Sequence, residues 1–459
     1  MIQKSLGTIA TMIQIENDLT QYGEVQINGV SIDSRNIEKG NLFVPFKGEK
    51  VDGHRYVEDA ISRGASAAFW QKDVPNPPLH LPLLIVEDPL TALQELARSY
   101  RNQLKTKVLG ITGSNGKTTT KDIAANLLGI KYNVKKTEGN FNNHIGLPLT
   151  ILRLSEDTEI AVLEMGMSAR GEIEFLTKLA QPVAVIITNI GESHLLDLGS
   201  REAIADAKLE IIQGLKSGGV IIYHGDEPLL TERLASYSGN GRLLTFGKSE
   251  ENLLYPVKVE QTSTGSTFVI NQSSQPFQLP VLGNHNILNA LSAMLAAEFF
   301  GIPFERMNEG FSELKLTNMR MELLEGSRGE SIINDAYNAS PTSMNAAIEL
   351  ITNLKGHKRK ILVLGDMLEL GPKEEEYHYQ VGLSLNPEQI DYVFAYGQLA
   401  AFIGDGATKA LGRDRVFSYD DKQELIEKLK SVVTSESLVL VKASRGMKLE
   451  EVVTTLQSE

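Results

Sequence analysis

Short apolar runs alternate with amphipathic stretches over most of the chain. In the central part, each apolar run is followed by a stretch with helical periodicity. The runs lie at residues 83–86, 107–112, 160–166, 183–190 and 219–225. Strands that are apolar on both faces and separated by helices are typical of a parallel sheet that is covered on both sides. The pattern therefore predicts an α/β fold.

Two changes of pattern divide the chain into three predicted domains. Residues 73–82 are rich in proline, which predicts a linker. A second boundary is expected near Thr317, after a predicted helix at 286–300. The three predicted domains are residues 1–82, 83–316 and 317–459.

Each predicted domain has a pattern of its own. The first combines short strands at 25–33 and 41–46 with an amphipathic helix at 54–65. Within the central domain, residues 243–282 alternate polar and apolar positions around turn residues, which predicts a small antiparallel excursion. The last domain repeats strand–helix alternation and is predicted to be a smaller, Rossmann-like α/β unit.

Composition narrows the classes of function. The 459 residues include no cysteine, which excludes disulfides, thiolate metal sites and cysteine nucleophiles. The net charge of −13 argues against a nucleic-acid partner, because a phosphate backbone requires a basic face. No apolar run approaches the ~20 residues that span a bilayer, and the first residues lack the apolar core of a signal peptide. We expect no membrane insertion and a cytoplasmic location.

A phosphate-binding loop is the strongest local signal. An apolar strand leads into a glycine-containing loop, and a helical pattern follows directly. The loop comprises Gly113, Ser114, Asn115, Gly116, Lys117, Thr118 and Thr119. Backbone N–H groups in such a loop bind phosphate oxygens, the Lys117 ammonium reaches the β and γ phosphates, and the Thr118 hydroxyl binds Mg²⁺. A glycine-rich helix cap is the alternative. Ile111 stands where the full P-loop pattern has glycine, so the loop is a variant.

The loop GSNGKTTT resembles that of the Mur ligase family, which also contains folylpolyglutamate synthases. Further matches follow in order along nearly the whole chain: DSR at 33–35, EGNFNN at 138–143, EMG at 164–166, NIG at 189–191, AK at 207–208, GNHN at 283–286, DAYNASP at 335–341, GDMLELG at 365–371 and KASR at 442–445. DAYNASP replaces the DYAHxP-type motif of the ligases that add the third residue, and no DNPR-type motif occurs. The similarity is therefore greatest to members that add D-alanyl-D-alanine, although Ser340 stands where asparagine is common.

The resemblance implies an ATP-dependent amide ligase of peptidoglycan precursor synthesis. ATP would phosphorylate the carboxylate of a UDP-N-acetylmuramoyl-tripeptide, and the amine of D-alanyl-D-alanine would attack the acyl phosphate. The first domain would bind uridine, the central domain ATP, and the last the amine acceptor. The implied cofactors are ATP and Mg²⁺, with two ions expected. We expect a monomer whose three hinged domains close on substrate.

The metal and catalytic residues follow from the same resemblance. Thr118, Glu164, His194 and Lys208 would hold magnesium, and Lys117 would act with the last three in catalysis. Glu164 follows an apolar strand, where open parallel sheets place their ligands. A bare ammonium would repel Mg²⁺, so Lys208 is expected to be carbamylated. The alternatives are that Glu164 is a solvated carboxylate, that His194 is structural and that Lys208 is a surface charge.

The remaining candidates would bind nucleotide or substrate. Those expected at the nucleotide, besides the loop, are Asn189, Asn289, Arg320 and Asp335, with His285 beside the adenine. Those expected at the substrates are Ser34, Arg35, Phe43, Lys47, Asn140, Asn142, Asn143, Asn338, Lys442, Ser444 and Arg445. The alternatives are an ordinary asparagine-rich turn for Asn140, Asn142 and Asn143, helix capping for Asn289 and His285, and a surface loop for Lys442, Ser444 and Arg445.

Three other functions stay open at this point. Another ligase of the family, including one that adds glutamate to folate, would share the central motifs. A P-loop motor or switch would hydrolyse nucleotide without an amine acceptor. A scaffold without catalytic activity would leave Lys117, Glu164 and His194 unexplained.

Overall fold

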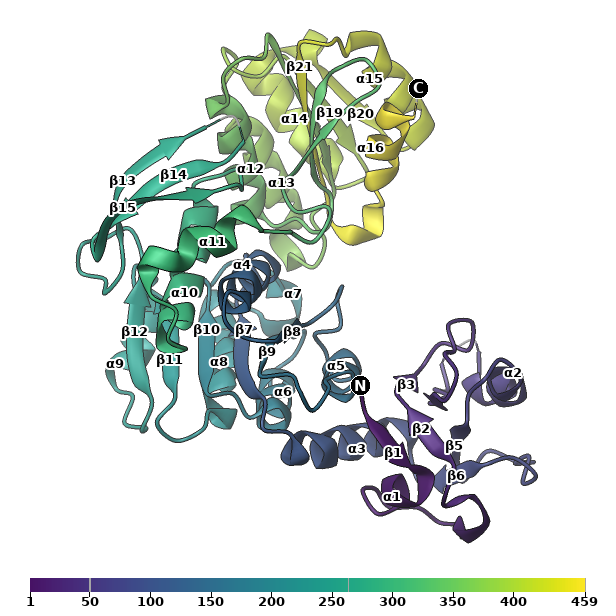
Figure 1. Cartoon of the computed structure of the whole chain (residues 1–459). Helices are drawn as coiled ribbons and strands as arrows, with labels where there is room; N and C mark the ends of the chain where they lie inside the picture. The colour runs from purple at the N-terminus through teal and green to yellow at the C-terminus, as the bar shows by residue number, and fades with distance from the viewer. Residues whose placement is uncertain (49–50, 263, 459) are drawn as a thin grey trace.

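Three α/β units follow one another along the chain (Figure 1). The computed structural model describes residues 1–48, 51–262 and 264–458. The amino-terminal unit, in purple, is joined through the long helix α3 (Pro89–Gln103) to the central unit, and the carboxyl-terminal unit, in light green and yellow, lies beyond it. The α/β prediction is confirmed. None of the described helices is long and apolar enough to cross a membrane.

The first unit contains a parallel sheet of four short strands and a separate antiparallel pair. The parallel strands are β3 (Val30–Ser31), β4 (Leu42–Phe43), β5 (Ala67–Gln71) and β6 (Leu83–Val86). The pair is β1 (Gln3–Ser5) with β2 (Gln26–Asn28), and the helices are α1 (Leu6–Ala10) and α2 (Val57–Ser62). Residues 25–33, expected as one strand, form β2 and β3 in different sheets. Gly29 separates them at φ +80°, a conformation that L side chains rarely adopt.

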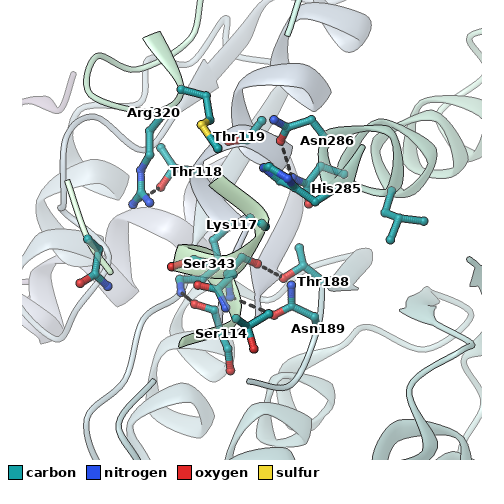
Figure 2. A pocket seen from close by; sticks show the side chains of 18 of the residues that line it. Ser114, Lys117, Thr118, Thr119, Thr188, Asn189, His285, Asn286, Arg320 and Ser343 are labelled. Atoms are coloured by element: carbon teal, nitrogen blue, oxygen red, sulfur yellow. Dashed lines mark hydrogen bonds between the residues drawn. The ribbon is translucent and has the colours of Figure 1, made fainter. Parts of the chain in front are cut away.

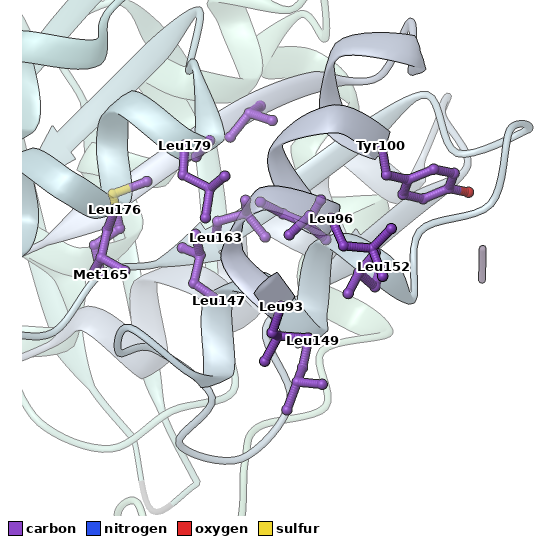
Figure 3. Packing of buried hydrophobic residues seen from close by; sticks show 14 of the residues in the cluster. Leu93, Leu96, Tyr100, Leu147, Leu149, Leu152, Leu163, Met165, Leu176 and Leu179 are labelled. Atoms are coloured by element: carbon purple, nitrogen blue, oxygen red, sulfur yellow. The ribbon is translucent and has the colours of Figure 1, made fainter. Parts of the chain in front are cut away.

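The first domain boundary is later than the sequence predicts. β6 pairs in parallel with β5, so residues 73–82 connect two strands of one sheet and are not a linker between domains. The predicted limit at residue 82 is therefore wrong. Helix α3, which follows β6, packs Leu93 and Leu96 into one continuous apolar cluster with Leu147 and Leu163 of the central unit (Figure 3).

The central unit is a six-stranded, fully parallel sheet in the order β12–β11–β10–β7–β9–β8. The strands are β7 (Lys107–Thr112), β8 (Val134–Lys136), β9 (Ile160–Glu164), β10 (Ala184–Ile187), β11 (Val220–His224) and β12 (Arg242–Phe246). Successive residues of β7 face opposite sides. Val108 packs with the cluster of α3, and Leu109 packs with that of α4 (Lys117–Gly129) and α10 (His285–Phe299). Both faces are covered, which explains the continuous apolar runs.

Helices and a small sheet surround the central strands. The helices are α4 (Lys117–Gly129), α5 (Gly146–Leu152), α6 (Glu172–Ala180), α7 (Leu195–Leu198), α8 (Arg201–Leu209), α9 (Pro228–Ala235), α10 (His285–Phe299) and α11 (Met307–Ser312). The antiparallel sheet comprises β13 (Pro256–Gln261), β14 (Ser266–Ile270) and β15 (Ser273–Leu279). The predicted excursion at 243–282 thus begins too early, because β12 still pairs in parallel with β11.

The carboxyl-terminal unit has a six-stranded sheet in the order β16–β17–β21–β18–β19–β20. Its strands are β16 (Glu322–Glu325), β17 (Ser331–Asp335), β18 (Arg359–Gly365), β19 (Tyr392–Tyr396), β20 (Val416–Tyr419) and β21 (Ser437–Lys442), and β16 alone is antiparallel to its neighbour. Its helices are α12 (Pro341–Asn353), α13 (Glu374–Leu383), α14 (Ala400–Leu411), α15 (Lys422–Val432) and α16 (Glu450–Gln457). The predicted limit at 316/317 falls between α11 and β16 and stays a prediction.

Candidate active site

The phosphate-binding loop connects β7 to α4, as the sequence predicts. Gly113 and Gly116 adopt φ values of +146° and +81°. A Cβ atom at Gly113 would lie 1.8 Å from Thr188 Oγ1, and one at Gly116 would lie 2.3 Å from Asn289 Oδ1. Both positions therefore require glycine. Ile111 is fully buried in the strand before the loop, where it contributes to the core and not to the phosphate site.

Lys117 opens α4 and points back over the loop. Its ammonium donates hydrogen bonds to the backbone carbonyls of Gly113 at 2.7 Å and Ser114 at 3.3 Å. Burial lowers the pKa of Lys117; Glu164 opposes this effect and Arg320 adds to it. A cation held by two carbonyls at the start of a helix is placed to meet phosphate oxygens.

A cavity of about 150 Å³ lies between the central and carboxyl-terminal units. Ten predicted nucleotide residues line it: Ser114, Asn115, Gly116, Lys117, Thr118, Thr119, Asn189, Asn289, Arg320 and Asp335. His285 lines it as well (Figure 2). Gly113, the first residue of the loop, is not among the lining residues, and its carbonyl accepts the hydrogen bond from Lys117. We call this cavity the nucleotide cleft.

Sequence reasoning missed several lining residues: Thr188, His224, Asn286, Leu288, Met321, Thr342, Ser343 and Ala346. Thr188 donates a 2.6 Å hydrogen bond to the Asn115 carbonyl and directly precedes Asn189, so its place at the end of β10 was a usable signal. Thr342, Ser343 and Ala346 belong to α12, whose approach depends on how the units pack. No local pattern marks such residues.

Glu164 ends β9 beside the start of α4, and only 3% of the residue is exposed. Its Oε2 accepts a 3.0 Å hydrogen bond from Thr118 Oγ1, and its Oε1 accepts one of 2.9 Å from Asn142 Nδ2. A buried carboxylate and a hydroxyl in contact are the oxygen donors that a hard divalent cation prefers. The structure thus brings two of the four predicted metal residues together.

His194 and Lys208 lie near Lys117, whose charge acts on both. Burial, Lys117 and Lys208 together lower the pKa of His194 to about 4, so its imidazole is neutral at pH 7. Its Nδ1 lies 2.9 Å from Glu369 Oε2 of the carboxyl-terminal unit, a close approach without hydrogen-bond geometry. Among the described residues, His194, Asp197 and Glu369 form a cluster that could hold a cation. Glu369 belongs to the GDMLELG motif, but sequence reasoning gave it no role.

Lys208 is buried near the end of α8, with 2% of the residue exposed. Burial lowers its pKa well below the ordinary lysine value, and the nearby Lys117 lowers it further. Within the described part of the chain, no hydrogen bond or ion pair holds its ammonium. A buried, unpaired lysine is costly as a cation and favours the neutral amine.

Lys442 has the opposite environment. It ends β21 in register with Asp335 at the end of β17, and its ammonium donates to Asp335 Oδ2 and, at 2.9 Å, to the Asn338 carbonyl. Lys442 lines the nucleotide cleft. Its predicted contact with the acceptor substrate gains no support from this position and stays a prediction.

A second cavity, of about 260 Å³, adjoins His194. Four predicted substrate residues line it, namely Asn140, Asn338, Ser444 and Arg445, together with Tyr337 and Glu369. Ser444 Oγ accepts a 2.9 Å hydrogen bond from the Leu368 amide. Arg445 is ion-paired with Glu450 at 2.7 Å, yet 54% of its side chain is exposed. We call this space the acceptor cavity.

Comparison with known proteins agrees with this arrangement. Profiles of three family domains match: the catalytic domain of the Mur ligase family at 26–101, the Mur ligase middle domain at 111–297, and the Mur ligase glutamate ligase domain at 319–445. The chain belongs to the Mur ligase family. A UDP-N-acetylmuramoyl-tripeptide–D-alanyl-D-alanine ligase of Bacillus subtilis is 52% identical over 99% of both chains, and the Escherichia coli protein of that name is 33% identical over 98% of both.

Solved structures of Mur ligases have the same fold. MurF from Acinetobacter baumannii superposes with a TM-score of 0.90 at 28% identity, covering 100% of this chain and 99% of that one. A MurF ligase from Thermotoga maritima in complex with ADP gives 0.81 at 30% identity, covering 94% and 97%. The likeness covers all three units of this Mur ligase.

Two of the predicted asparagines in this Mur ligase have structural partners. Asn142 holds the Glu164 carboxylate, as described above. Asn143 Oδ1 accepts from the Gly146 amide at 2.9 Å and so caps the start of α5. The alternative of an ordinary turn therefore explains Asn143, whereas Asn140 faces the acceptor cavity.

The candidates of the first unit are not gathered into a described cavity. Phe43 is 2% exposed and packs against Val57 and Trp70, so the prediction that its ring contacts substrate is wrong. Arg35 is exposed and makes two 2.9 Å hydrogen bonds to Asp33, which lower the pKa of Asp33 to about 2.

Two further candidates and a neighbouring cavity complete this side. Ser34 is half-buried and Lys47 is exposed. A cavity of about 410 Å³ between the first and central units is lined by Asn36, Lys135 and Arg153, but by none of the four candidates of the first unit.

Proposed function

We propose that this Mur ligase joins D-alanyl-D-alanine to a UDP-N-acetylmuramoyl-tripeptide and converts ATP to ADP and phosphate. It is then a carbon–nitrogen ligase of class 6.3.2 that acts in peptidoglycan precursor synthesis. The observation that carries the proposal is the 52% identity, over 99% of both chains, to a protein of that name. The nucleotide cleft supplies the ATP site that this chemistry requires.

The residues of the cleft fit a magnesium–ATP complex. The Thr118 hydroxyl and the Glu164 carboxylate touch at 3.0 Å and would hold one ion, and the neutral imidazole of His194 with Lys208 would hold a second. Bound magnesium supplies charge neutralisation for the phosphates. Lys117 adds a mobile cation at the loop, and Arg320 adds a fixed one from the carboxyl-terminal unit.

Lys208 fits as a metal residue when it carries a carbamate. The neutral amine nitrogen attacks the carbon of CO₂, a C–N bond forms, and a proton leaves to solvent. Burial and the nearby Lys117 favour the neutral amine that this step needs. The product is an anion at a position where the described chain offers the lysine no partner.

The reaction proceeds in two displacements. A carboxylate oxygen of the tripeptide attacks the γ-phosphorus, an O–P bond forms, and the bond to ADP breaks. The neutral amine of the dipeptide then attacks the acyl carbon, a C–N bond forms, and phosphate leaves as the nitrogen loses a proton. Lys117 and Arg320 stabilise the phosphoryl charge, and closure of the units excludes water from the acyl phosphate.

The acceptor cavity is the proposed place of the dipeptide. Arg445 would pair with its carboxylate, while Asn338 and Ser444 supply polar contacts. The cavity adjoins His194, so an amine there would face the activated carboxyl group. The uridine end would lie on the first unit, near Ser34, Arg35 and Lys47. We propose a cytoplasmic location, which the nucleotide substrates favour, and a monomeric active form.

One assay tests this proposal. Phosphate release is measured with UDP-N-acetylmuramoyl-tripeptides that end in lysine or diaminopimelate, each with and without D-alanyl-D-alanine. We expect release that depends on both substrates, together with a pentapeptide product detected by mass spectrometry. Release without the dipeptide, or with glutamate and folate instead, would exclude the proposed reaction. Sedimentation at assay concentration tests the monomer.

A further inference from the structure

A buried carboxylate on α4 is not explained by the chemistry above. Asp122 lies one helical turn after Thr118 and is fully buried. Its Oδ1 accepts a 2.6 Å hydrogen bond from Lys136 Nζ and lies 3.4 Å from the Nζ of the equally buried Lys121. Two ammonium groups therefore neutralise its charge on one side.

The other carboxylate oxygen leaves the central unit. Asp122 Oδ2 accepts a 2.7 Å hydrogen bond from the backbone N–H of Thr317, in the connection between α11 and β16. Lys121 Nζ also lies 3.5 Å from Thr317 Oγ1. An ionised acceptor in a buried position binds an N–H group more strongly than a neutral one. The helix that begins at the phosphate-binding loop thus holds the start of the interdomain connection.

The same connection carries Arg320 to the nucleotide cleft. Its guanidinium stacks over the Tyr337 ring at 4.1 Å, and its Nη2 lies 3.5 Å from Thr118 Oγ1. Thr118 and Asp122 face the same side of α4, because residues four apart are neighbours on a helix. One face of α4 therefore contacts both ends of the stretch from Thr317 to Arg320.

We propose that Asp122 is a positioning residue, which fixes the connection at Thr317 and thereby places Arg320 against the nucleotide phosphates. This inference rests on the proposed function. Without the anchor, the stretch 317–320 gains conformational freedom, and Arg320 loses its fixed approach to Thr118. The cost falls on the step in which phosphoryl charge develops, and little on the binding of the acceptor.

A double-mutant cycle between Asp122→Ala and Arg320→Ala tests the proposal. Each single variant should lower kcat, Asp122→Ala by about 30-fold, with KM for D-alanyl-D-alanine changed less than about threefold. In the double variant, the Asp122 change should add less than about threefold to the effect of Arg320→Ala. A full 30-fold loss on the Arg320→Ala background, or wild-type kcat in Asp122→Ala, overturns the proposal.

A second variant separates positioning from folding. Thr317→Pro removes the amide donor but leaves Asp122 and its two lysines in place, so it should reproduce the loss of kcat and the same non-additivity with Arg320→Ala. If Thr317→Pro keeps wild-type kcat, the anchor has no role. The matched control is Glu309→Ala, which removes a carboxylate of α11 paired with Arg306 at 2.7 Å and should leave kcat unchanged.

The wild-type chain in the same assay keeps the two proposals apart. Absence of ligation by the wild type refutes the proposed function. Normal ligation by the wild type with additive variant effects refutes only the role of Asp122.

Discussion

Lys208 and Lys442 occupy the two sides of the active site and are equally buried, with 2% of each residue exposed. Burial lowers the pKa of both. At Lys442 the neighbouring Asp335 opposes that effect and forms an ion pair. At Lys208 no anion of the described chain does so, and Lys117 lowers the pKa further. Lysine thus has a charged partner at position 442 and none among the described residues at position 208.

The difference distinguishes charged residues that stabilise the folded site from residues whose partner would be a bound ligand. Breaking a buried ion pair leaves an uncompensated charge and is costly, so Lys442 and Asp335 hold the last domain together at the cleft. An unpaired buried ammonium weakens the fold, and proteins retain such groups mainly where they act chemically. Lys208 is such a group, and we place beside it, as candidate ligand-binding residues, Lys117, whose ammonium has only two backbone carbonyls as partners, and the neutral His194.

The largest effect is expected when the ammonium of Lys117, near Lys208, is removed. Lys117→Ala should lower ligation by at least about 10³-fold, because the γ-phosphate loses its mobile counter-ion in the transition state. Phosphate release and product formation measure the loss. Lys131→Ala, an exposed lysine just beyond α4, is the control and should retain full activity. Near-normal ligation by Lys117→Ala would disprove the role of the loop.

Replacement of each buried lysine by methionine tests the comparison directly. Lys442→Met should lower the free energy of unfolding by about 3–5 kcal/mol, because Asp335 stays buried without its partner. Lys208→Met should leave that free energy unchanged or raise it, yet lower ligation by about 100-fold or more through loss of a metal ligand. Denaturant unfolding and the ligation assay give the two numbers.

Replacing Lys208 by alanine tests the carbamate more directly. Lys208→Ala should be nearly inactive, and a small added carboxylic acid should restore part of the activity by replacing the carbamate. Normal ligation by Lys208→Ala, or a free ammonium in a nucleotide complex, would rule out the carbamate.

The sequence predicts the residues around Lys117 and Lys208 better than the pairing of Lys442 with Asp335. The loop, Glu164 and His194 follow β7, β9 and β10, and the carboxyl ends of neighbouring parallel strands meet at one edge. The partners in the Lys442–Asp335 pair are 107 residues apart, so only the assembled sheet reveals the pairing.

Local pattern also misses burial and register. Phe43 is expected at the substrate from the sequence but faces the core, since a two-residue strand gives too little alternation to assign a face. β6 follows a proline-rich loop that resembles a linker, and only its pairing with β5 places it in the first sheet.

The histidines extend the comparison to pH. His194 lies beside Lys208, and His285 lies beside Lys442 and Asp335; burial is the main cause that lowers the pKa of each to about 4. An unfolded histidine has a pKa of about 6.5, so between these values the unfolded chain binds more protons. Stability should be full above pH 6.5 and fall as pH decreases toward 4, by up to about 3 kcal/mol for each histidine.

Two variants check this expectation by thermal unfolding between pH 7.5 and 4.5. His194→Gln and His285→Gln should each flatten the pH dependence of stability, because the replaced group no longer takes up a proton on unfolding. Parallel curves of stability against pH for the wild type and both variants would show that other groups cause the loss of stability at low pH. Because Asp335 raises and Lys442 lowers the pKa of His285, Lys442→Met should reduce the pH dependence that His285 contributes.

The smallest expected effect concerns the acceptor cavity, which neither buried lysine enters. Arg445 is exposed enough to reach a ligand there; its guanidinium contacts the Glu450 carboxylate at 2.7 Å and donates to Met319 Sδ at 3.2 Å. Arg445→Ala should raise KM for D-alanyl-D-alanine by about tenfold, the loss of one charge-assisted hydrogen bond, with KM for ATP nearly unchanged. Arg413→Ala, an exposed arginine of the same unit, is the control. An equal or greater rise in KM for ATP would place Arg445 with the nucleotide, and the dipeptide carboxylate would then need another cation of the last domain.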